Sequence, residues 1–453
     1  MSRPVAFRTS HALSSCRLEL NMAEHQRSHM RWVLIIWMFV VSAIAYLDRV
    51  NISIAGHSIM EEFHLSNIQL GWIFSAFVIG YALFQAPGGS LADRFGPRLV
   101  LTAGVVWWSI FTTATALLPA AFAAPLVLLI VLRFVLGAGE AVVYPSSNRL
   151  VANWIPTNER GIANGLIFAG VGVGAGITPP LITFILVRYG WEWCFYGSAL
   201  IGLGAGVIWY LLARDNPEKH RWVSKSELEL IRAGLDGGVP QKASKIPWGA
   251  ILRSKEVLAI TISYFCYGYV AYIFFTWFFI YLTTVRGLDL KSGSNFTMLP
   301  FLGMAACSPL GGVISDWLTR RRGKRLGRCG IAVFGVGLAA IFIVLGAQAE
   351  SPRTASVFLA AGVGALYLSQ SSYWAVTADI AGQWAGSVSG TMNMGGQFGG
   401  ALTATLTPAI AARFGWSASF WAAAAMCVVG SLAWLLVDPY KKLAREVPAE
   451  SAA

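Results

Sequence analysis

The sequence predicts an all-α membrane protein with twelve transmembrane helices in two six-helix bundles. Three observations predict this fold: the composition, the spacing of the apolar runs, and an internal repeat. Of the 453 residues, 56% are apolar and only 12% are charged, against about 25% charged in typical globular proteins. So few charged side chains cannot cover a water-exposed surface, and we therefore expect the bilayer to be the main solvent.

Apolar stretches recur along the chain, and each is close to the roughly 20 residues that a helix needs to cross the hydrocarbon. They cover residues 32–54, 70–92, 99–118, 125–147, 161–187, 193–213, 257–284, 296–315, 329–346, 354–378, 385–410 and 417–437. Six lie on either side of a polar stretch. We therefore predict an N-terminal tail 1–30, a first bundle 31–213, a linker 214–256, a second bundle 257–437 and a C-terminal tail 438–453.

A short polar pattern follows the second apolar run and recurs about half the chain later. The first copy contains Gly89, Asp93, Arg94, Gly96 and Arg98, and the second contains Gly312, Asp316 and Arg320. A polar turn at the same place in both halves of an apolar chain indicates two parallel repeats, as in duplicated membrane transporters.

The distribution of basic residues predicts the orientation in the membrane. With a cytoplasmic N-terminus, most Lys and Arg lie in the cytoplasmic segments. The outer segments hold few, namely Arg188, Arg286, Lys291, Arg353 and Arg413. This asymmetry predicts that both termini are cytoplasmic. The net charge of +12 then reflects topology and lipid contact, and we expect no nucleic-acid partner. Short outer segments favour a bacterial inner membrane, the plasma membrane of the cell, and we expect a monomer.

Four ionisable residues lie inside predicted helices of the first half. Asp48 and Arg49 are in the first helix, and Arg133 and Glu140 share one face of the fourth. A charge at a helix centre costs on the order of 2.5 to 3.5 kcal/mol on insertion scales. A cluster that only locks helices together is one interpretation, but intramembrane charge more often marks a functional site.

These charges suit the transport of an organic anion. An anion in a low-dielectric cavity needs a fixed positive partner, and Arg49 is the candidate. Tyr46 and Tyr81 either add hydroxyl groups to the substrate site or serve only in packing. We expect Glu140 to carry the coupled proton, with Arg133 as the partner that discharges it and Asp48 as a second proton site. We expect a proton gradient as the driving force, no cofactor and no metal site.

Polar and aromatic residues at helical spacing occur in the second half. Ser371, Trp374, Asn393 and Gln397 are expected to complete the substrate cavity, although the amides could instead hydrogen-bond neighbouring helices. The seventh helix is rich in tyrosine, which predicts either an outer gate or an interfacial aromatic belt.

The repeated polar pattern predicts a cytoplasmic gate. Asp93 could accept hydrogen bonds from neighbouring helix N-termini, and Arg94 and Arg98 could pair with Glu159. Asp316 and Arg320 would act in the same way in the second half. Such a cluster would hold the cytoplasmic side closed in one state. A generic topological anchor is the other interpretation.

Two motifs resemble the anion:cation symporter branch of the major facilitator superfamily, which includes bacterial hexuronate, galactonate and glucarate carriers. The first is Tyr46-Leu47-Asp48-Arg49-Val50-Asn51-Ile52-Ser53-Ile54-Ala55, and the second runs from Arg133-Phe134 through Gly137, Gly139, Glu140 and Pro145. The similarity extends from residue 31 to residue 440. It implies proton symport of a sugar acid, with Arg49 on the substrate carboxylate and Asp48 and Glu140 carrying protons. It also implies that Trp374 and Asn393 line the site.

Other functions remain as alternatives. A proton-coupled exporter of drugs or other small molecules is the first, although a cation exporter gains little from Arg49 in its pocket. Uptake of a non-sugar mono- or dicarboxylate is the second, and sodium could in principle replace the proton. An enzyme is not expected, because all six His lie outside the predicted helix cores and the six Cys lack metal or redox spacing.

Overall fold

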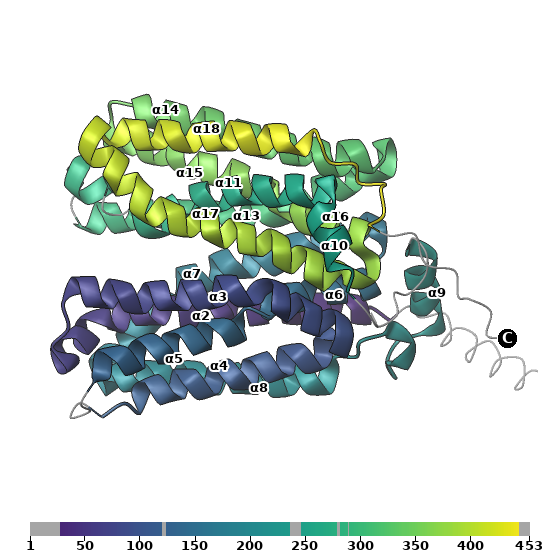
Figure 1. The fold of residues 1–453 in the computed structure, drawn as a ribbon, viewed down its shortest axis with the longest axis horizontal. Helices are drawn as coiled ribbons and strands as arrows, with labels where there is room; N and C mark the ends of the chain where they lie inside the picture. The colour runs from purple at the N-terminus through teal and green to yellow at the C-terminus, as the bar shows by residue number, and fades with distance from the viewer. Residues whose placement is uncertain (1–27, 120–123, 236–245, 279–280, 289, 444–453) are drawn as a thin grey trace, which may run out of the picture.

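The computed structural model describes residues 28–119, 124–235, 246–278, 281–288 and 290–443. Within these ranges the chain forms helices and turns, and no strand. Two groups of long, nearly parallel helices lie side by side in Figure 1, one drawn from the first half of the chain and one from the second. The all-helical, two-bundle architecture predicted from the sequence is therefore confirmed.

Each bundle contains six transmembrane segments. The first comprises α2 (Met30–Phe63), α3 (Asn67–Phe95), α4 (Pro97–Ala116), α5 (Pro125–Glu140) with α6 (Val143–Trp154), α7 (Arg160–Tyr189) and α8 (Trp191–Leu212). The second comprises α11 (Lys255–Thr276), α13 (Leu290–Arg322), α14 (Ile331–Gln348), α15 (Pro352–Leu368) with α16 (Gln370–Ala381), α17 (Ala385–Phe414) and α18 (Trp416–Trp434). The linker carries α9 (Lys225–Gly234) and α10 (Trp248–Arg253). Among the described residues, ten helices are long and apolar enough to cross a membrane.

The fourth segment of each bundle is broken, whereas the sequence predicted one continuous helix in each case. In the first bundle, a turn at residues 141–142 separates α5 from α6. In the second, Ser369 separates α15 from α16, and its hydroxyl donates to the carbonyl of Leu366 at 2.5 Å. Such local side-chain bonds compete with the helical ladder. The break at Ser369 leaves two short helices where a single spanning helix was expected.

Glycines bring the two bundles into backbone contact. An added Cβ on Gly89 of α3 would overlap the carbonyl of Gly386 at the start of α17. An added Cβ on Gly312 of α13 would likewise overlap the carbonyl of Gly161 at the start of α7. Small residues allow membrane helices to approach this closely. Gly89 and Gly312 of the repeated pattern are therefore two of the points at which the bundles touch.

The linker helix α9 docks onto the beginning of α2. Glu227 of α9 is buried and accepts hydrogen bonds from the backbone N–H groups of Met30 and Arg31, both at 3.1 Å. A carboxylate at this position satisfies two free donors of the helix N-terminus and opposes its positive dipole. The helical part of the linker is thus attached to the first bundle.

Close packing inside the first bundle can be tested at Gly137 of α5, where an added Cβ would overlap the carbonyl of Phe77 in α3. We expect Gly137→Ala to lower the free energy of unfolding by about 1 to 3 kcal/mol through overpacking. Gly197 of α8 is the matched control, because an added Cβ there meets no atom within 4 Å. Gly197→Ala should leave stability unchanged or raise it by up to about 1 kcal/mol. Thermal unfolding in detergent measures both, and equal effects would contradict this assignment.

Candidate functional site

The charged residues of the first and fourth segments meet between α2 and α5. The Arg49 guanidinium donates from Nη2 to Glu140 Oε1 at 2.6 Å, and the Glu140 side chain is only 2% exposed. Three aromatic rings surround the guanidinium: its carbon lies 4.7 Å from the ring centroid of Tyr46, 5.1 Å from that of Phe77 and 4.4 Å from that of Tyr81. Aromatic faces attract a cation and shield it from lipid. The rings therefore hold the Arg49 guanidinium, which extends from α2, beside Glu140 at the end of α5.

This pairing differs from the one expected from the sequence, which matched Glu140 with Arg133. Seven residues along a helix correspond to about 10 Å of rise, so two residues on one face need not touch. In the part of the chain that the structure describes, Arg133 has no ion-pair partner, and its guanidinium carbon lies 4.9 Å from the ring centroid of Phe77. Arg133 and Arg49 thus lie against the same phenylalanine.

Asp48 lies beside this cluster and reaches α4. Its Oδ2 accepts a hydrogen bond from the hydroxyl of Thr112 in α4 at 2.9 Å, and the residue is 3% exposed. The remaining oxygens Asp48 Oδ1 and Glu140 Oε2 are buried without a hydrogen-bond partner. Each carboxylate therefore keeps one oxygen at which a proton can be held without breaking an existing bond.

A small cavity lies between the two bundles, next to the charged cluster. It is about 40 Å³, room for a few waters by the measure in which one water needs roughly 10 to 15 Å³. Its lining is mostly aromatic, with three amides: Tyr46, Tyr81, Tyr144, Phe168, Tyr264, Tyr267, Tyr272, Phe275, Tyr367, Gln370, Asn393 and Gln397. Both bundles contribute to this lining, so the cavity changes shape whenever the bundles move relative to each other.

The second-half candidates occupy different positions around this cavity. Gln397 accepts a hydrogen bond from the hydroxyl of Tyr272 at 2.6 Å. Asn393 donates across the bundle interface to Gln85 Oε1 at 2.9 Å. Ser371 is fully buried, does not line the cavity, and has a hydroxyl without a hydrogen-bond partner. The expectation that Ser371 faces the substrate cavity therefore differs from the structure.

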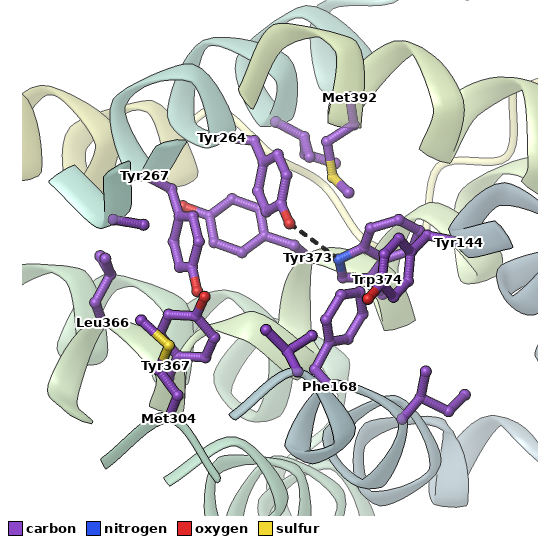
Figure 2. Packing of buried hydrophobic residues seen from close by; sticks show 14 of the residues in the cluster. Tyr144, Phe168, Tyr264, Tyr267, Met304, Leu366, Tyr367, Tyr373, Trp374 and Met392 are labelled. Carbon is purple, nitrogen blue, oxygen red and sulfur yellow. Dashed lines mark hydrogen bonds between the residues drawn. The ribbon is translucent and has the colours of Figure 1, made fainter. Parts of the chain in front are cut away.

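Trp374 was expected to line the cavity, but it is not among the lining residues and packs beside Tyr144 and Phe168 at the junction of the bundles (Figure 2). Its indole N–H donates to the Tyr264 hydroxyl at 3.3 Å within the second bundle. Its ring lies 4.9 Å from that of Phe168 in the first bundle, and Phe168 stacks on Tyr144 at 4.8 Å. Trp374 therefore supports the rings that line the cavity and connects the two halves through them.

Sequence reasoning missed several of these residues. Tyr264, Tyr267 and Tyr272 line the cavity, whereas an outer gate or belt was predicted for the seventh helix. Tyr144 and Gln85 were not considered at all. A tyrosine carries no positional signal in an apolar helix, because lipid-facing and cavity-facing positions have the same periodicity.

Asp93 joins the end of α3 to the first turn of α17. It accepts hydrogen bonds from the backbone N–H groups of Gly386 at 2.9 Å and Ser387 at 2.7 Å, and from the Ser387 hydroxyl at 2.6 Å. The Nε of Arg149 lies 3.8 Å from the same carboxylate. These bonds cap a helix N-terminus in the other bundle, as the sequence predicted for Asp93.

Asp316 forms the corresponding contact in the second half. It accepts from the N–H groups of Gly161 at 2.9 Å and Ile162 at 2.7 Å in the first turn of α7. Arg328 pairs with it at 2.6 Å and also donates to the carbonyl of Thr157 at 2.6 Å. We call the Asp93 and Asp316 contacts the paired caps, because each bundle caps one helix of the other.

An ion pair also crosses the interface at the same end of the molecule. Arg160, the first residue of α7, pairs with buried Asp379 of α16 at 2.5 Å. Nearby, Arg149 of α6 donates to the carbonyl of Gly382 at 3.0 Å. The end of the molecule that carries the linker is therefore closed by buried, charge-assisted bonds.

The remaining gating candidates have other partners than those predicted. Glu159 pairs with Arg31 at 3.1 Å rather than with Arg94 or Arg98. Arg98 donates from Nε to the carbonyl of Tyr210 at 3.0 Å, and Arg94 lies over Phe95 with 5.3 Å between guanidinium carbon and ring centroid. Arg320 reaches the carbonyl of Asn158 across the interface at 3.2 Å. Glu159 lies closer to the N-terminus of α2 than to the loop after α3, which accounts for the difference.

Comparisons with known proteins agree with this architecture. A sequence model of the Major Facilitator Superfamily matches residues 38–404. The chain is 35% identical over 418 residues to a probable sulfoacetate transporter, SauU, of Cupriavidus necator, covering 91% of this chain and 95% of the relative. It is 34% identical over 409 residues to the hexuronate transporter of Bacillus subtilis, covering 88% of this chain and 93% of the relative.

A further relative is the probable galactarate/D-glucarate transporter GudP of Escherichia coli, at 31% identity over 402 residues, covering 83% of this chain and 86% of the relative. Among solved structures, the proton:xylose symporter XylE matches with a TM-score of 0.73 at 16% identity, covering 90% of this chain and 95% of that one. At that identity, the likeness to XylE concerns the fold alone.

The paired caps generate a prediction about backbone exchange. Asp316→Ala removes the acceptor of the Gly161 and Ile162 N–H groups, and hydrogen bonds to a charged group are worth about 1.5 to 3 kcal/mol each. We expect hydrogen–deuterium exchange in the first turn of α7 to accelerate at least about tenfold. The first turn of α17 should also exchange faster, because the closed end opens as a unit.

Glu218→Ala is the control for this experiment, since it removes only the exposed pair of Glu218 with Arg232, and such pairs are worth little. Unchanged exchange in Asp316→Ala, or equal acceleration in both variants, would contradict a closing role for the paired caps.

Proposed function

The chain belongs to the Major Facilitator Superfamily, and from that premise we propose that it imports an organic anion by proton symport through alternating access. Membership makes it a multi-pass membrane transporter rather than an enzyme. Three of the relatives that match along most of the chain are named for organic anions: sulfoacetate, hexuronate and galactarate/glucarate.

The single observation that carries the proposal is the Arg49–Glu140 contact of 2.6 Å. Arg49 has one guanidinium, and ionised Glu140 occupies it. A substrate anion therefore competes with Glu140 for the same cation. Protonation of Glu140 removes the competitor and frees Arg49 for the substrate. Anion and proton then bind together and leave together, which is the requirement for symport.

Asp48 and Arg133 would complete this cycle. Asp48 lies next to Arg49 in the chain, is buried, and keeps one oxygen without a partner. We assign it a second proton, needed when the substrate carries two negative charges. Arg133, whose Nε is buried without a hydrogen-bond partner, is the group that can receive a carboxylate when the helices rearrange.

A sugar acid such as a hexuronate, aldonate or aldarate is the proposed substrate class. Two of the relatives are named for such acids. Tyrosine hydroxyls and the amides of Gln370, Asn393 and Gln397 line the cavity and can hydrogen-bond sugar hydroxyls. The cavity is too small for a sugar acid in this state, so we assign the structure to a closed stage of the cycle that opens to admit substrate.

Uptake of a small non-sugar anion is the second candidate. SauU, the relative that is 35% identical, is named for sulfoacetate, which has no sugar hydroxyls. The lining also offers more ring faces than amides. Both observations favour a panel of test substrates that contains sulfonates and short dicarboxylates beside sugar acids.

The paired caps provide the gate in this proposal. They and the Arg160–Asp379 pair close the end of the molecule that carries the linker. The excess of basic residues at that end supports a cytoplasmic location for it and for both termini. We propose the bacterial plasma membrane as the location and a monomer as the functional unit.

Uptake into proteoliposomes tests the substrate assignment. A panel of radiolabelled sugar acids, sulfonates and dicarboxylates is offered under an inward proton gradient. We expect one class to accumulate and Arg49→Ala to reduce its accumulation at least about a hundredfold, since a charged hydrogen-bonded partner is lost in a desolvated site. Arg188→Ala, at an exposed position of α7, is the matched control and should transport normally. Accumulation that survives Arg49→Ala would remove Arg49 from the substrate site.

Coupling is tested separately with Glu140→Gln. The amide keeps the shape of the side chain and cannot release a proton, so Arg49 stays free for the substrate. We expect exchange of internal for external substrate to persist while uphill uptake under a pH gradient is lost. Collapsing the gradient with an ionophore should abolish uphill uptake by the wild type and leave substrate exchange by the variant unchanged. Full uphill uptake by Glu140→Gln would overturn the assignment of Glu140 as the proton carrier. Uptake that follows a sodium gradient would show that sodium, not the proton, is the coupling ion.

A further inference from the structure

A second cavity, of about 390 Å³, lies at the end of the molecule that carries the linker. It is formed where the junction of α10 and α11 meets the last turn of α16 and the chain that follows α18. Arg253, Lys255, Lys441 and Lys442 line it, together with Glu256. None of these residues takes part in the proposed transport cycle.

The lining of this cavity carries an excess of positive charge. Its one carboxylate, Glu256, has a side chain only 2% exposed and is bound by the Lys441 ammonium at 3.2 Å and the Ser254 hydroxyl at 2.9 Å. Lys255 and Lys441 have side chains 69% and 55% exposed. With the carboxylate already bound, the cavity suits a ligand of negative charge.

Its position favours a ligand that is also apolar. Directly along α11 from the cavity, Leu258 and Ile262 are 45% and 51% exposed. Leu432 near the end of α18, which packs against α11, and Leu436 just beyond that end are 58% and 64% exposed. We call these four exposed apolar side chains the apolar strip, because they lie on or beside two packed helices whose ends adjoin the basic cavity. A headgroup in the cavity would therefore have its acyl chains along the strip.

From these observations we infer that the cavity binds the phosphate of an anionic phospholipid in the adjacent leaflet. Basic pockets at the ends of transmembrane helices suit such headgroups, and each Lys or Arg near the surface contributes about a factor of five in affinity. A soluble phosphate compound shares the charge but makes no use of the apolar strip. The strip is the reason to assign the lipid.

The site also adjoins the closed end of the transporter. Lys442 donates from Nζ to the backbone carbonyl of Asp379 at 3.0 Å, and the Asp379 carboxylate holds Arg160 of the other bundle. The inference does not depend on the proposed substrate or coupling ion, because lipid binding is measured without transport.

Native mass spectrometry of the detergent-solubilised full chain tests it, with phosphatidylglycerol titrated against zwitterionic phosphatidylethanolamine. We expect wild-type protein to retain phosphatidylglycerol selectively. The triple variant Arg253→Gln, Lys255→Gln, Lys441→Gln should bind it roughly a hundredfold more weakly. The double variant Arg253→Gln, Lys255→Gln keeps Lys441, the nearer cation to Glu256. Its affinity for phosphatidylglycerol should fall roughly tenfold or more with unchanged thermal stability.

The matched control neutralises the exposed linker cations Lys219, Arg221 and Lys225 to Gln, and it should bind phosphatidylglycerol as the wild type does. Equal affinity for the two lipids, or an equal loss in the linker control, would overturn the inference. A thermal shift with inorganic phosphate that matches the shift with phosphatidylglycerol and disappears in the triple variant would overturn the lipid assignment in favour of a soluble phosphate compound.

Discussion

An unpaired charge in hydrocarbon is costly, and this constraint organises the centre of the molecule. Arg49 is held by Glu140 at 2.6 Å and by three aromatic rings, while Asp48 is held by Thr112. Removing any partner leaves a buried charge whose penalty is several kcal/mol. The same constraint makes a chemical cycle possible, because a proton or a substrate anion can each replace a partner. Stability of the fold and exchange of ligands therefore depend on the same few contacts.

The paired caps apply a related principle at the closed end. Asp93 and Asp316 each satisfy backbone donors at a helix N-terminus of the opposite bundle, and glycines beside them allow the backbones to touch. A carboxylate against a helix N-terminus is a strong contact over a short range, so small separations of the bundles suffice to release it. A gate of the proposed kind would therefore be firm when closed and have few intermediate positions.

Much of the fold could be predicted from the sequence, because helix length, apolar composition and the repeat are all local properties. The caps by Asp93 and Asp316 were also predictable, since each follows a transmembrane run and precedes a basic turn. The partners of Glu140 and Glu159 were not, because they depend on the rotation of one helix against another, which periodicity does not fix. The break at Ser369 and the role of Tyr264 escaped prediction for the same reason: their signals are contacts, not patterns.

The central cluster of Asp48, Arg49, Arg133 and Glu140 contains two carboxyl groups and two guanidinium groups. With all four ionised, the empty carrier has no net charge within the membrane. In the proposed cycle, a protonated Glu140 and a bound monoanion again sum to zero. Moving one elementary charge through 100 mV is worth about 2.3 kcal/mol, but neither form of this carrier moves any. The electrical potential across the membrane would then do no work on the protein, and accumulation of a monoanion would be set by the difference in pH alone.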